Sequence, residues 1–417
     1  MKQRSGEASV VGNCRFASAL FWASSVWLVL ALCGRPAGGA DSQRATASGA
    51  DDSQKGAEID RLIRELGAPT FMARQRAQRA LVALGVDARP ALEAASRDPD
   101  HEIRQRARVA LDAIVDVDFH VRLAEFIVDD DVEDGHGLAG WERYRSLVGA
   151  SPPARRLFAD MQRAERDLLE AVEKHPAQSG TVLDARCLQL ESRTQDADAI
   201  RPTQYPLSTM AALLFAASTP DLPVSDRAGN CINSFGNQVV LSQALHSRTT
   251  GGLVRAFLEA WVARSFERDA VTGYGTLLLA MQYDLKGALG PAMAMVTPGL
   301  GGAPRLEQYA ILAIGKLGSL EHLPALERLL SDERSIPDRG GRESEVQIRD
   351  VALAAMLHIT GQKLADYGFV HAKLNALYLF NTNTLSFSDP AARDEALKKW
   401  RAWREKPKKE NDRGMGD

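Results

Sequence analysis

Cysteine and aromatic residues are scarce in this chain. Of its 417 residues only 4 are cysteine, and phenylalanine, tryptophan and tyrosine together make up 6%. The chain therefore cannot be a small fold built on disulfides. A mainly β structure is disfavoured, because aromatic side chains are among those that pack best on a pleated sheet. No Cys-x-x-Cys pair occurs, which removes the usual sequence sign of a thioredoxin-like centre or of an attached c-type haem.

Motifs for catalysis are lacking as well. The 8 histidines are scattered, and the chain holds neither a His-Glu-x-x-His motif nor a His-x-x-x-His pair, so a zinc protease is not predicted. Ser234 lacks the leading glycine of a nucleophile elbow, and the glycines at 299, 301 and 302 lack the lysine of a phosphate-binding loop. We therefore predict no catalytic residues, no cofactor and a protein that is not an enzyme.

One acidic stretch, from Asp129 to His136, has the composition of a calcium loop. An EF-hand loop takes oxygen ligands at alternate positions, a glycine at the sixth and an acid at the twelfth. With Gly135 at the sixth position, Val132 falls on the third and Trp141 on the twelfth. The stretch is therefore interpreted as a solvated acidic loop in preference to a metal site, and no metal ligands are predicted.

Basic residues are not in excess either. The 51 lysines and arginines stand against 54 acidic residues, a net charge of −3. Residues 1–40 carry a net +3, which leaves −6 for the rest of the chain. Binding along a phosphate backbone needs a basic stripe that releases counterions. Nucleic acid is therefore not expected as a partner.

Residues 1–40 have the features of a secretory signal peptide. Lys2, Arg4 and Arg15 precede an uncharged run over residues 16–33, and the small residues Gly38 and Ala40 suit cleavage before residue 41. We predict a periplasmic or secreted protein. The alternative is an uncleaved segment that tethers the protein to the membrane.

Removal of this segment would leave two cysteines, Cys187 and Cys231. An even pair in an oxidising compartment is a candidate disulfide. The alternative is a pair of buried free thiols, because cysteine is often a small core residue.

The chain does contain an internal repeat. Residues 68–84 align with residues 98–114 at a constant offset of thirty positions, and weaker copies begin near Leu306 and Ile348. In each copy, small and apolar residues recur every three or four positions. This spacing predicts a helix with one apolar face, which needs stacked neighbours to bury it. The identical pairs are Pro69/Pro99, Arg74/Arg104, Gln75/Gln105, Arg76/Arg106, Ala77/Ala107, Ala80/Ala110 and Leu81/Leu111.

Prolines 90, 291 and 324 each precede one of these helices, and their recurrence predicts a bend inside a partner helix. A helix with an internal proline, a short turn and a helix with Ile/Val-Arg-x-x-Ala-x-x-Ala-Leu resembles the HEAT-repeat family. The layout is similar to secreted HEAT-repeat proteins of planctomycete-like bacteria. The resemblance covers about 57–115 and 285–360. The matching residues are Pro90, Asp98, Ile103, Arg104, Ala107, Ala110 and Leu111.

The resemblance implies an all-α, HEAT-like helical-repeat solenoid of the armadillo type, with an irregular helical middle segment. It also implies a ladder of aspartate and arginine, here Asp98 with Arg104 and Asp332 with Arg349. The predicted parts are a signal peptide (1–40), a flexible linker (41–56), N-terminal repeats (57–118), a helical middle region (119–250), C-terminal repeats (251–375), and a final helix with a charged tail (376–417).

We expect a non-catalytic scaffold that binds a protein or peptide partner. Polar residues facing away from the apolar stripe would form the binding row, which consists of Gln75, Gln78, Arg79, Gln105 and Arg108. A solvated face that only keeps the repeats soluble is the alternative. Two other functions remain open: an enzyme with an unrecognised site within 119–300, and a structural protein that binds glycan or the envelope.

Overall fold

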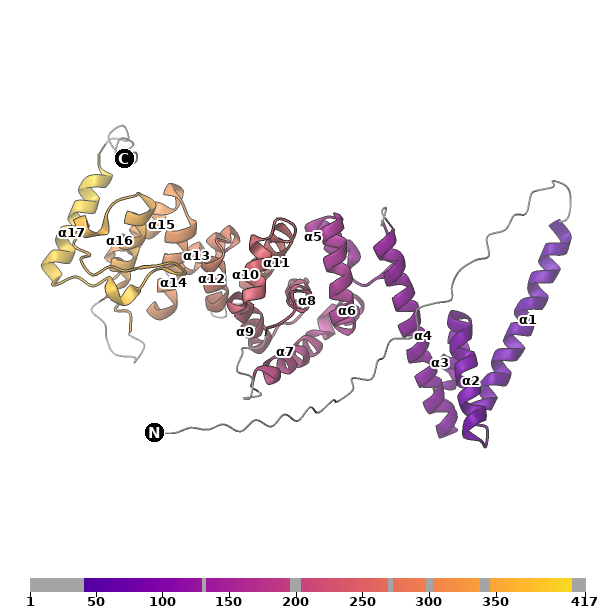
Figure 1. Ribbon diagram of the computed structural model, residues 1–417. Coiled ribbons are helices and arrows are strands. Elements are labelled where there is room, and N and C mark those ends of the chain that lie inside the picture. Colours follow the sequence, from indigo (N-terminus) through magenta and orange to yellow (C-terminus); the bar gives the residue numbers. More distant parts are fainter. Residues whose placement is uncertain are drawn as a thin grey trace, which may run out of the picture. The chain divides into compact units, whose positions relative to one another are not determined.

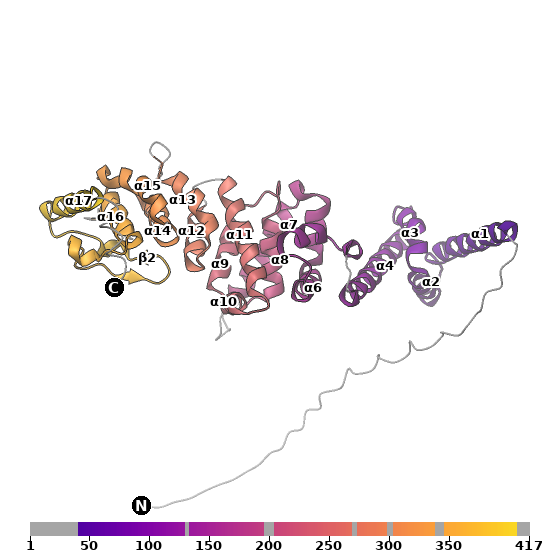
Figure 2. The same ribbon diagram turned by 90° about the horizontal axis from the view of Figure 1, so that it is seen from above.

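The structure is a computed structural model that describes residues 41–129, 133–195, 204–268, 273–297, 303–337 and 346–406. The predicted signal peptide lies outside these residues. The chain divides into two compact units, residues 1–110 and residues 111–417, each of which is described by itself (Figures 1 and 2). Within the described ranges almost every element is a helix, which confirms the all-α prediction. None of the described helices combines the length and the apolar character needed to cross a membrane.

The first unit contains the first repeat and the start of the second. Its helices are α1 (Asp41–Glu65), α2 (Phe71–Leu84), α3 (Arg89–Ala95) and the beginning of α4 (His101–Val128). The stripe residues Ala77, Leu81, Ala107 and Ala110 are all fully buried, as the repeat spacing predicts.

Residues 41–56 differ from the prediction of a flexible linker, because they lie within α1. Ile59 and Leu62 of α1 are buried, and α1 packs on α2 and α3. Once this packed part is helical, the helix can extend toward its N-terminus. Each further residue gains one backbone hydrogen bond, and the free-energy cost of starting a helix is not incurred again. Helix therefore continues back to residue 41.

Arg74 and Arg104 make the same hydrogen bonds in the two repeats. Nη1 of each donates to the carbonyl oxygens six and five residues before it, at 2.9 and 3.2 Å for Arg74 and at 2.6 and 3.3 Å for Arg104. Each arginine thus ties the start of its helix to the preceding turn. Arg104 does contact Asp98 as predicted, but through the main-chain carbonyl. No ion pair joins these two described residues, and the Asp98 carboxylate accepts from the amide of Asp100 at 2.8 Å.

The second predicted ladder pair is also absent. The amide of Arg349 donates to the carbonyl of Asp332 at 3.1 Å, so the two main chains meet and the side chains find other partners. Nη1 of Arg349 lies 2.9 Å from Oε1 of Glu333, and the Asp332 carboxylate binds Arg334 at 2.6 Å.

The three repeated prolines lie near the beginning of short helices, not in their interior. Pro90 is in α3, Pro291 in α13 (Leu289–Met295) and Pro324 in α15 (Leu323–Glu327). Each short helix follows directly on a 3-10 turn. Proline is tolerated in the first turn of a helix, where the backbone N–H has no partner within the helix.

The second unit continues from α4 into a series of helices that pack on one another. In turn, α6 packs on α8, α8 on α11, α11 on α12, α12 on α14 and α14 on α16 (Figures 1 and 2). The elements are α5 (Trp141–Val148), α6 (Pro152–Lys174), α7 (Gly180–Gln195), α8 (Leu207–Ala217), α9 (Asp226–Ser234), α10 (Val239–His246), α11 (Gly251–Arg268), α12 (Gly273–Gln282), α13, α14 (Pro304–Leu317), α15, α16 (Ile348–Ile359), the strands β1 (Leu374–Asn375) and β2 (Leu379–Phe380), and α17 (Pro390–Arg404).

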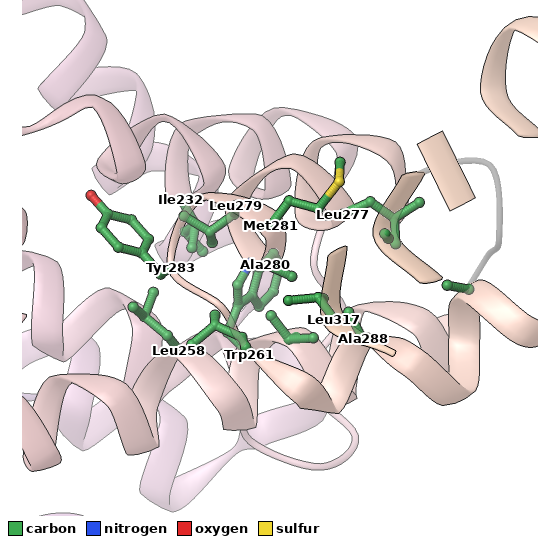
Figure 3. Packing of buried hydrophobic residues seen from close by; sticks show 14 of the residues in the cluster. Ile232, Leu258, Trp261, Leu277, Leu279, Ala280, Met281, Tyr283, Ala288 and Leu317 are labelled. Atoms are coloured by element: carbon green, nitrogen blue, oxygen red, sulfur yellow. The ribbon is translucent and has the colours of Figure 1, made fainter. Parts of the chain in front are cut away.

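The core of this unit is continuous from Phe119 to Trp400. Figure 3 shows its packing between α11 and α12, where Trp261 and Ala280 are fully buried. A single helix over 230–246 is the sequence expectation here, but the chain forms α9 and α10. A 3-10 turn at Phe235–Asn237 separates them, and Phe235 is fully buried there.

Three buried carboxylates are each held by an arginine from another element. Asp350 of α16 binds Arg393 of α17 through two contacts of 2.8 and 3.1 Å. In the same way, Glu165 binds Arg186, and Glu307 binds Arg334 at 2.7 Å. Each of these carboxylates requires its arginine, because removing the arginine leaves a buried negative charge with less compensation.

Candidate functional site

The predicted binding row on α2 and α4 is only partly free. Arg79, Gln105 and Arg108 are exposed and Gln75 is half-buried. Oε1 of Gln78 accepts a hydrogen bond from Nη1 of Arg106 at 3.1 Å, so Gln78 links α2 to α4. Partner binding by this row remains a prediction. Gln78 already uses its side-chain oxygen for a contact within the protein.

A larger site lies in the second unit, which we call the C-terminal groove. It has a volume of about 1280 Å³. Residues far apart in the sequence line it, from the start of α12, the first half of α14, and the segments before and after the small hairpin. The lining is Tyr274, Arg305, Leu306, Gln308, Tyr309, Leu312, Ile336, Pro337, Val346, Lys373, Asn375, Tyr378, Phe380, Asn381, Thr382, Asn383 and Thr384.

Helix α14 supplies one face of the groove. Its lining residues Arg305, Gln308, Tyr309 and Leu312 are spaced by three, one and three positions, which places them on one side of a helix. The opposite side of α14 packs on α13 and α16, where Ala310 and Ile314 are fully buried. The same packing that fixes α14 in the core therefore orients its groove face.

The hairpin β1–β2 and the loop after it form the other wall. Strands β1 and β2 pair antiparallel, with Asn375 opposite Leu379. The side chain of Asn375 closes the turn by accepting from the amides of Leu377 and Tyr378 at 2.9 and 3.1 Å. Nζ of Lys316 donates to the carbonyl of Ala376 at 2.8 Å, which fastens the turn to α14.

Three tyrosines of the groove form a connected cluster. The rings of Tyr274 and Tyr309 lie 4.6 Å apart at 70°, and those of Tyr309 and Tyr378 lie 6.5 Å apart at 88°. These are edge-to-face contacts, which stabilise aromatic pairs. Burial and a hydrogen bond with Tyr309 raise the pKa of Tyr274, so its phenol stays neutral and can both donate and accept hydrogen bonds.

Among the described residues that line the groove, only Arg305 and Lys373 are charged, and both are exposed. No ion pair within the described ranges involves the guanidinium of Arg305 or the ammonium of Lys373. The described lining is thus positively charged in a chain whose net charge is −3.

Gln308, a lining residue of the groove, carries a buried acceptor that is not used. Its side chain is buried, with 4% of the residue exposed. Nε2 donates to the carbonyl of Arg305 at 2.9 Å, whereas Oε1 accepts no hydrogen bond within the described part of the chain. A buried acceptor without a donor costs about 1–3 kcal/mol, which a ligand N–H or O–H would recover.

The lining chemistry suits binding. Tyrosine, asparagine, glutamine and threonine side chains all offer hydrogen bonds, while the lining includes no histidine, cysteine, aspartate or glutamate to act as a general acid or base near neutral pH. Over the described ranges as a whole, no three histidine, cysteine, aspartate or glutamate side chains are grouped to hold a metal ion.

A smaller pocket of about 340 Å³ adjoins the groove, because Tyr274 lines both. Asn233 organises this pocket. Its Oδ1 accepts from Nε1 of Trp261 at 2.9 Å and from the Thr276 hydroxyl at 3.3 Å. A polar surface therefore continues past Tyr274 toward α9 and α11.

The structure holds Cys187 and Cys231 as two buried free thiols, which differs from the disulfide that export predicts. They are nevertheless neighbours on the packed helices α7 and α9. The contact with Cys231, together with burial, raises the pKa of the Cys187 thiol. Their pairing stays a prediction for an oxidising compartment.

Several residues of the acidic stretch 129–136 contact one another, and others lie outside the described ranges. Residues 130–132 lie outside the described ranges. Nε2 of His136 lies 3.0 Å from the Asp129 carboxylate, and Asp134 accepts from the amide of His136 at 2.9 Å.

The groove was not predicted from the sequence. Its residues come from positions 274 to 384 and only folding brings them together. The available signal was the polar Asn-Thr-Asn-Thr run at 381–384, directly after Tyr378 and Phe380. Comparison of the chain with protein-family models, with curated proteins and with solved structures gave no match.

Proposed function

We propose that this protein is a non-catalytic binding protein that holds a peptide segment of a partner protein in the C-terminal groove. Its helices would form a HEAT-like solenoid, and the signal peptide expected at 1–40 would place it in the periplasm or outside the cell. The groove is the observation that carries the proposal.

Peptide binding fits the groove because the hydrogen-bonding groups of the lining side chains complement those of a peptide main chain. A peptide offers a donor and an acceptor at each residue, and the side-chain amide of Asn383, which lines the groove, offers both in return. The tyrosine cluster adds apolar area with hydroxyl groups, a combination enriched at protein interfaces. The unused Oε1 of Gln308 supplies a place for one peptide N–H.

Two features support the helical-repeat arrangement. Arg74 and Arg104 make equivalent hydrogen bonds thirty residues apart. A 3-10 turn, a short helix with proline and a longer apolar helix recur in order at α3–α4, α13–α14 and α15–α16. Stacked units of this kind present extended surfaces for binding.

The test is selection of peptides of about twelve residues, roughly 40 Å when extended, from a random displayed library on the purified full-length chain. Two variants compare the candidate surfaces. One carries Tyr309→Ala and Asn383→Ala in the groove, and the other carries Arg79→Ala and Gln105→Ala in the predicted row. Circular dichroism of each variant confirms that it is folded.

We expect the selected peptides to bind the second variant normally and the groove variant at least about tenfold more weakly, which is about 1.4 kcal/mol. The opposite pattern would move the binding site to the row on α2 and α4. No selected peptide at all would refute peptide binding as the function.

A further inference from the structure

We propose that the groove binds an acidic peptide segment, in which carboxylates reach Arg305 and Lys373 while a neighbouring main-chain N–H bonds Oε1 of Gln308. This inference rests on the proposed function and adds the chemical class of the ligand.

The charges at the groove favour an acidic ligand. Arginines around the groove are mostly neutralised by internal partners: Arg334 by Glu307 and Asp332, Arg349 by Glu333, and Arg393 by Asp350. Arg305 and Lys373 are different, because both are exposed in the groove, and no acidic side chain among the described residues lines it. Two cations without an acid among the lining residues attract a ligand with negative charge.

Gln308 offers an acceptor that no donor within the described part of the chain fills. A free carboxylate brings acceptors only and would leave Oε1 of Gln308 unpaired. The ligand must therefore carry a donor as well as an acid. A peptide with aspartate or glutamate carries both, since every residue except proline has a main-chain N–H.

The tyrosine cluster favours a peptide over an acidic glycan, which also has donors and carboxylates. The successive tyrosine rings stand at 70° and 88° to one another. Because neighbouring rings are nearly perpendicular, they do not form one continuous flat platform on which successive sugar rings could stack.

The experiment uses the full-length chain and fluorescence anisotropy. The probes are three labelled peptides of the same length, taken from the library selection. The first peptide keeps the acidic residues that it had when it was selected. If the selected peptide has no acidic residue, aspartate is introduced at alternate positions. In the second every acid is changed to its amide, and in the third every acid is changed to lysine. A fourth probe is labelled oligogalacturonate, an acidic glycan.

The charge variant is Arg305→Gln with Lys373→Gln, and its matched control is Lys363→Gln with Lys398→Gln, two exposed lysines that do not line the groove. We expect the acidic peptide to bind at least about tenfold more tightly than its amide form. The charge variant should remove this preference, and the control should keep it. Added salt should weaken only the acidic peptide.

A second pair of variants tests the acceptor. Gln308→Leu should weaken all peptides that bind the groove. Gln162→Leu is the control, because Gln162 is a buried glutamine that also has an unpaired Oε1 and lies outside the groove. It should leave peptide binding unchanged even if it lowers the melting temperature.

The outcomes separate the two proposals. Equal affinity for the acidic and amide peptides overturns the acidic ligand and leaves peptide binding intact. Oligogalacturonate that binds more tightly than every peptide reassigns the groove to glycan and overturns the inference. A library selection without any binder overturns the proposed function and this inference with it.

Discussion

At the scale of single residues, buried carboxylates show how the packed helices are held together. Asp350 is 1% exposed and lies between α16 and α17, where its oxygens bind Arg393 and the amide of Gln347. Both charged groups are buried away from water, so the attraction between them must offset the free-energy cost of removing each from water.

The first prediction concerns this pair. Asp350→Ala should lower the free energy of unfolding by about 3–5 kcal/mol, because it removes the carboxylate that compensates the buried charge of Arg393. Replacing both residues with leucine should be much less harmful than the single change. Chemical denaturation measures both. Arg163→Ala, which breaks the exposed pair with Asp160, is the control and should cost less than about 1 kcal/mol.

Glu170 on α6 is expected to make a pH-dependent contribution to the stability of the fold. Partial burial works to raise the pKa of Glu170, but hydrogen bonds from Arg166 and Lys174 at 2.8 and 2.9 Å outweigh it, so the pKa is lowered. A carboxyl whose pKa is lower in the folded state stabilises the fold above its unfolded pKa, near 4.3, and loses this contribution as pH falls through the folded value.

The Glu170→Gln variant should therefore be less stable than the original chain at neutral pH, by about 0.5 kcal/mol as for other partly exposed pairs. The difference should shrink as pH falls below the unfolded pKa near 4.3 and through the lower pKa of folded Glu170. Melting temperatures of the two proteins across this pH range measure it. A constant difference at all pH values would show that the ion pairs contribute nothing.

At the scale of elements, α14 links the core to the groove. Gly315 lets α14 approach α16 and the hairpin closely, because a Cβ at this position would lie 2.8 Å from Cβ of Ala355 and 2.8 Å from Cδ2 of Leu379. The hairpin wall of the groove thus depends on a residue of α14 that has no side chain.

Gly315→Ala should destabilise the protein by about 1–3 kcal/mol through overpacking. It should also weaken peptide binding, because Leu379 must move. Gly290→Ala in α13 is the matched control, since a Cβ there has no neighbour within 4 Å. It should be neutral or slightly stabilising, as alanine is preferred to glycine in a helix. Equal melting temperatures for the two variants would argue against the close approach.

The helical elements could largely be predicted from the sequence, but the groove could not. The apolar spacing of α2 and α14 depends on local residues, and periodicity therefore reveals it. The division of 230–246 was missed because burial of Phe235 at a 3-10 turn is a tertiary effect. The groove joins Tyr274 to Tyr309 and Tyr378, and nothing local to any one of them signals the other two.

At the scale of the whole molecule, the expected export and the cysteine pair are linked. Cys187 and Cys231 are buried neighbours from α7 and α9, so oxidation would join residues that are already in contact. Closing a loop of this length would stabilise the fold by about 4 kcal/mol in the chain-entropy description.

Protein recovered from an oxidising compartment should therefore show no reactive thiol after unfolding without reductant. The same chain made in a reducing cytoplasm should show both Cys187 and Cys231 as reactive and melt at a lower temperature. Thiol titration of the two preparations measures this. Reactive Cys187 and Cys231 in the exported protein would end the proposal of a disulfide.

The central claim is that the C-terminal groove holds the ligand, and hydrogen exchange locates a ligand most directly. Amide exchange of the full-length chain is compared with and without a peptide selected from the library. We predict slower exchange at residues 305–312 and 373–384, with residues 71–84 and 101–110 unchanged. Protection confined to α2 and the first part of α4, with the groove unaffected, would contradict the account.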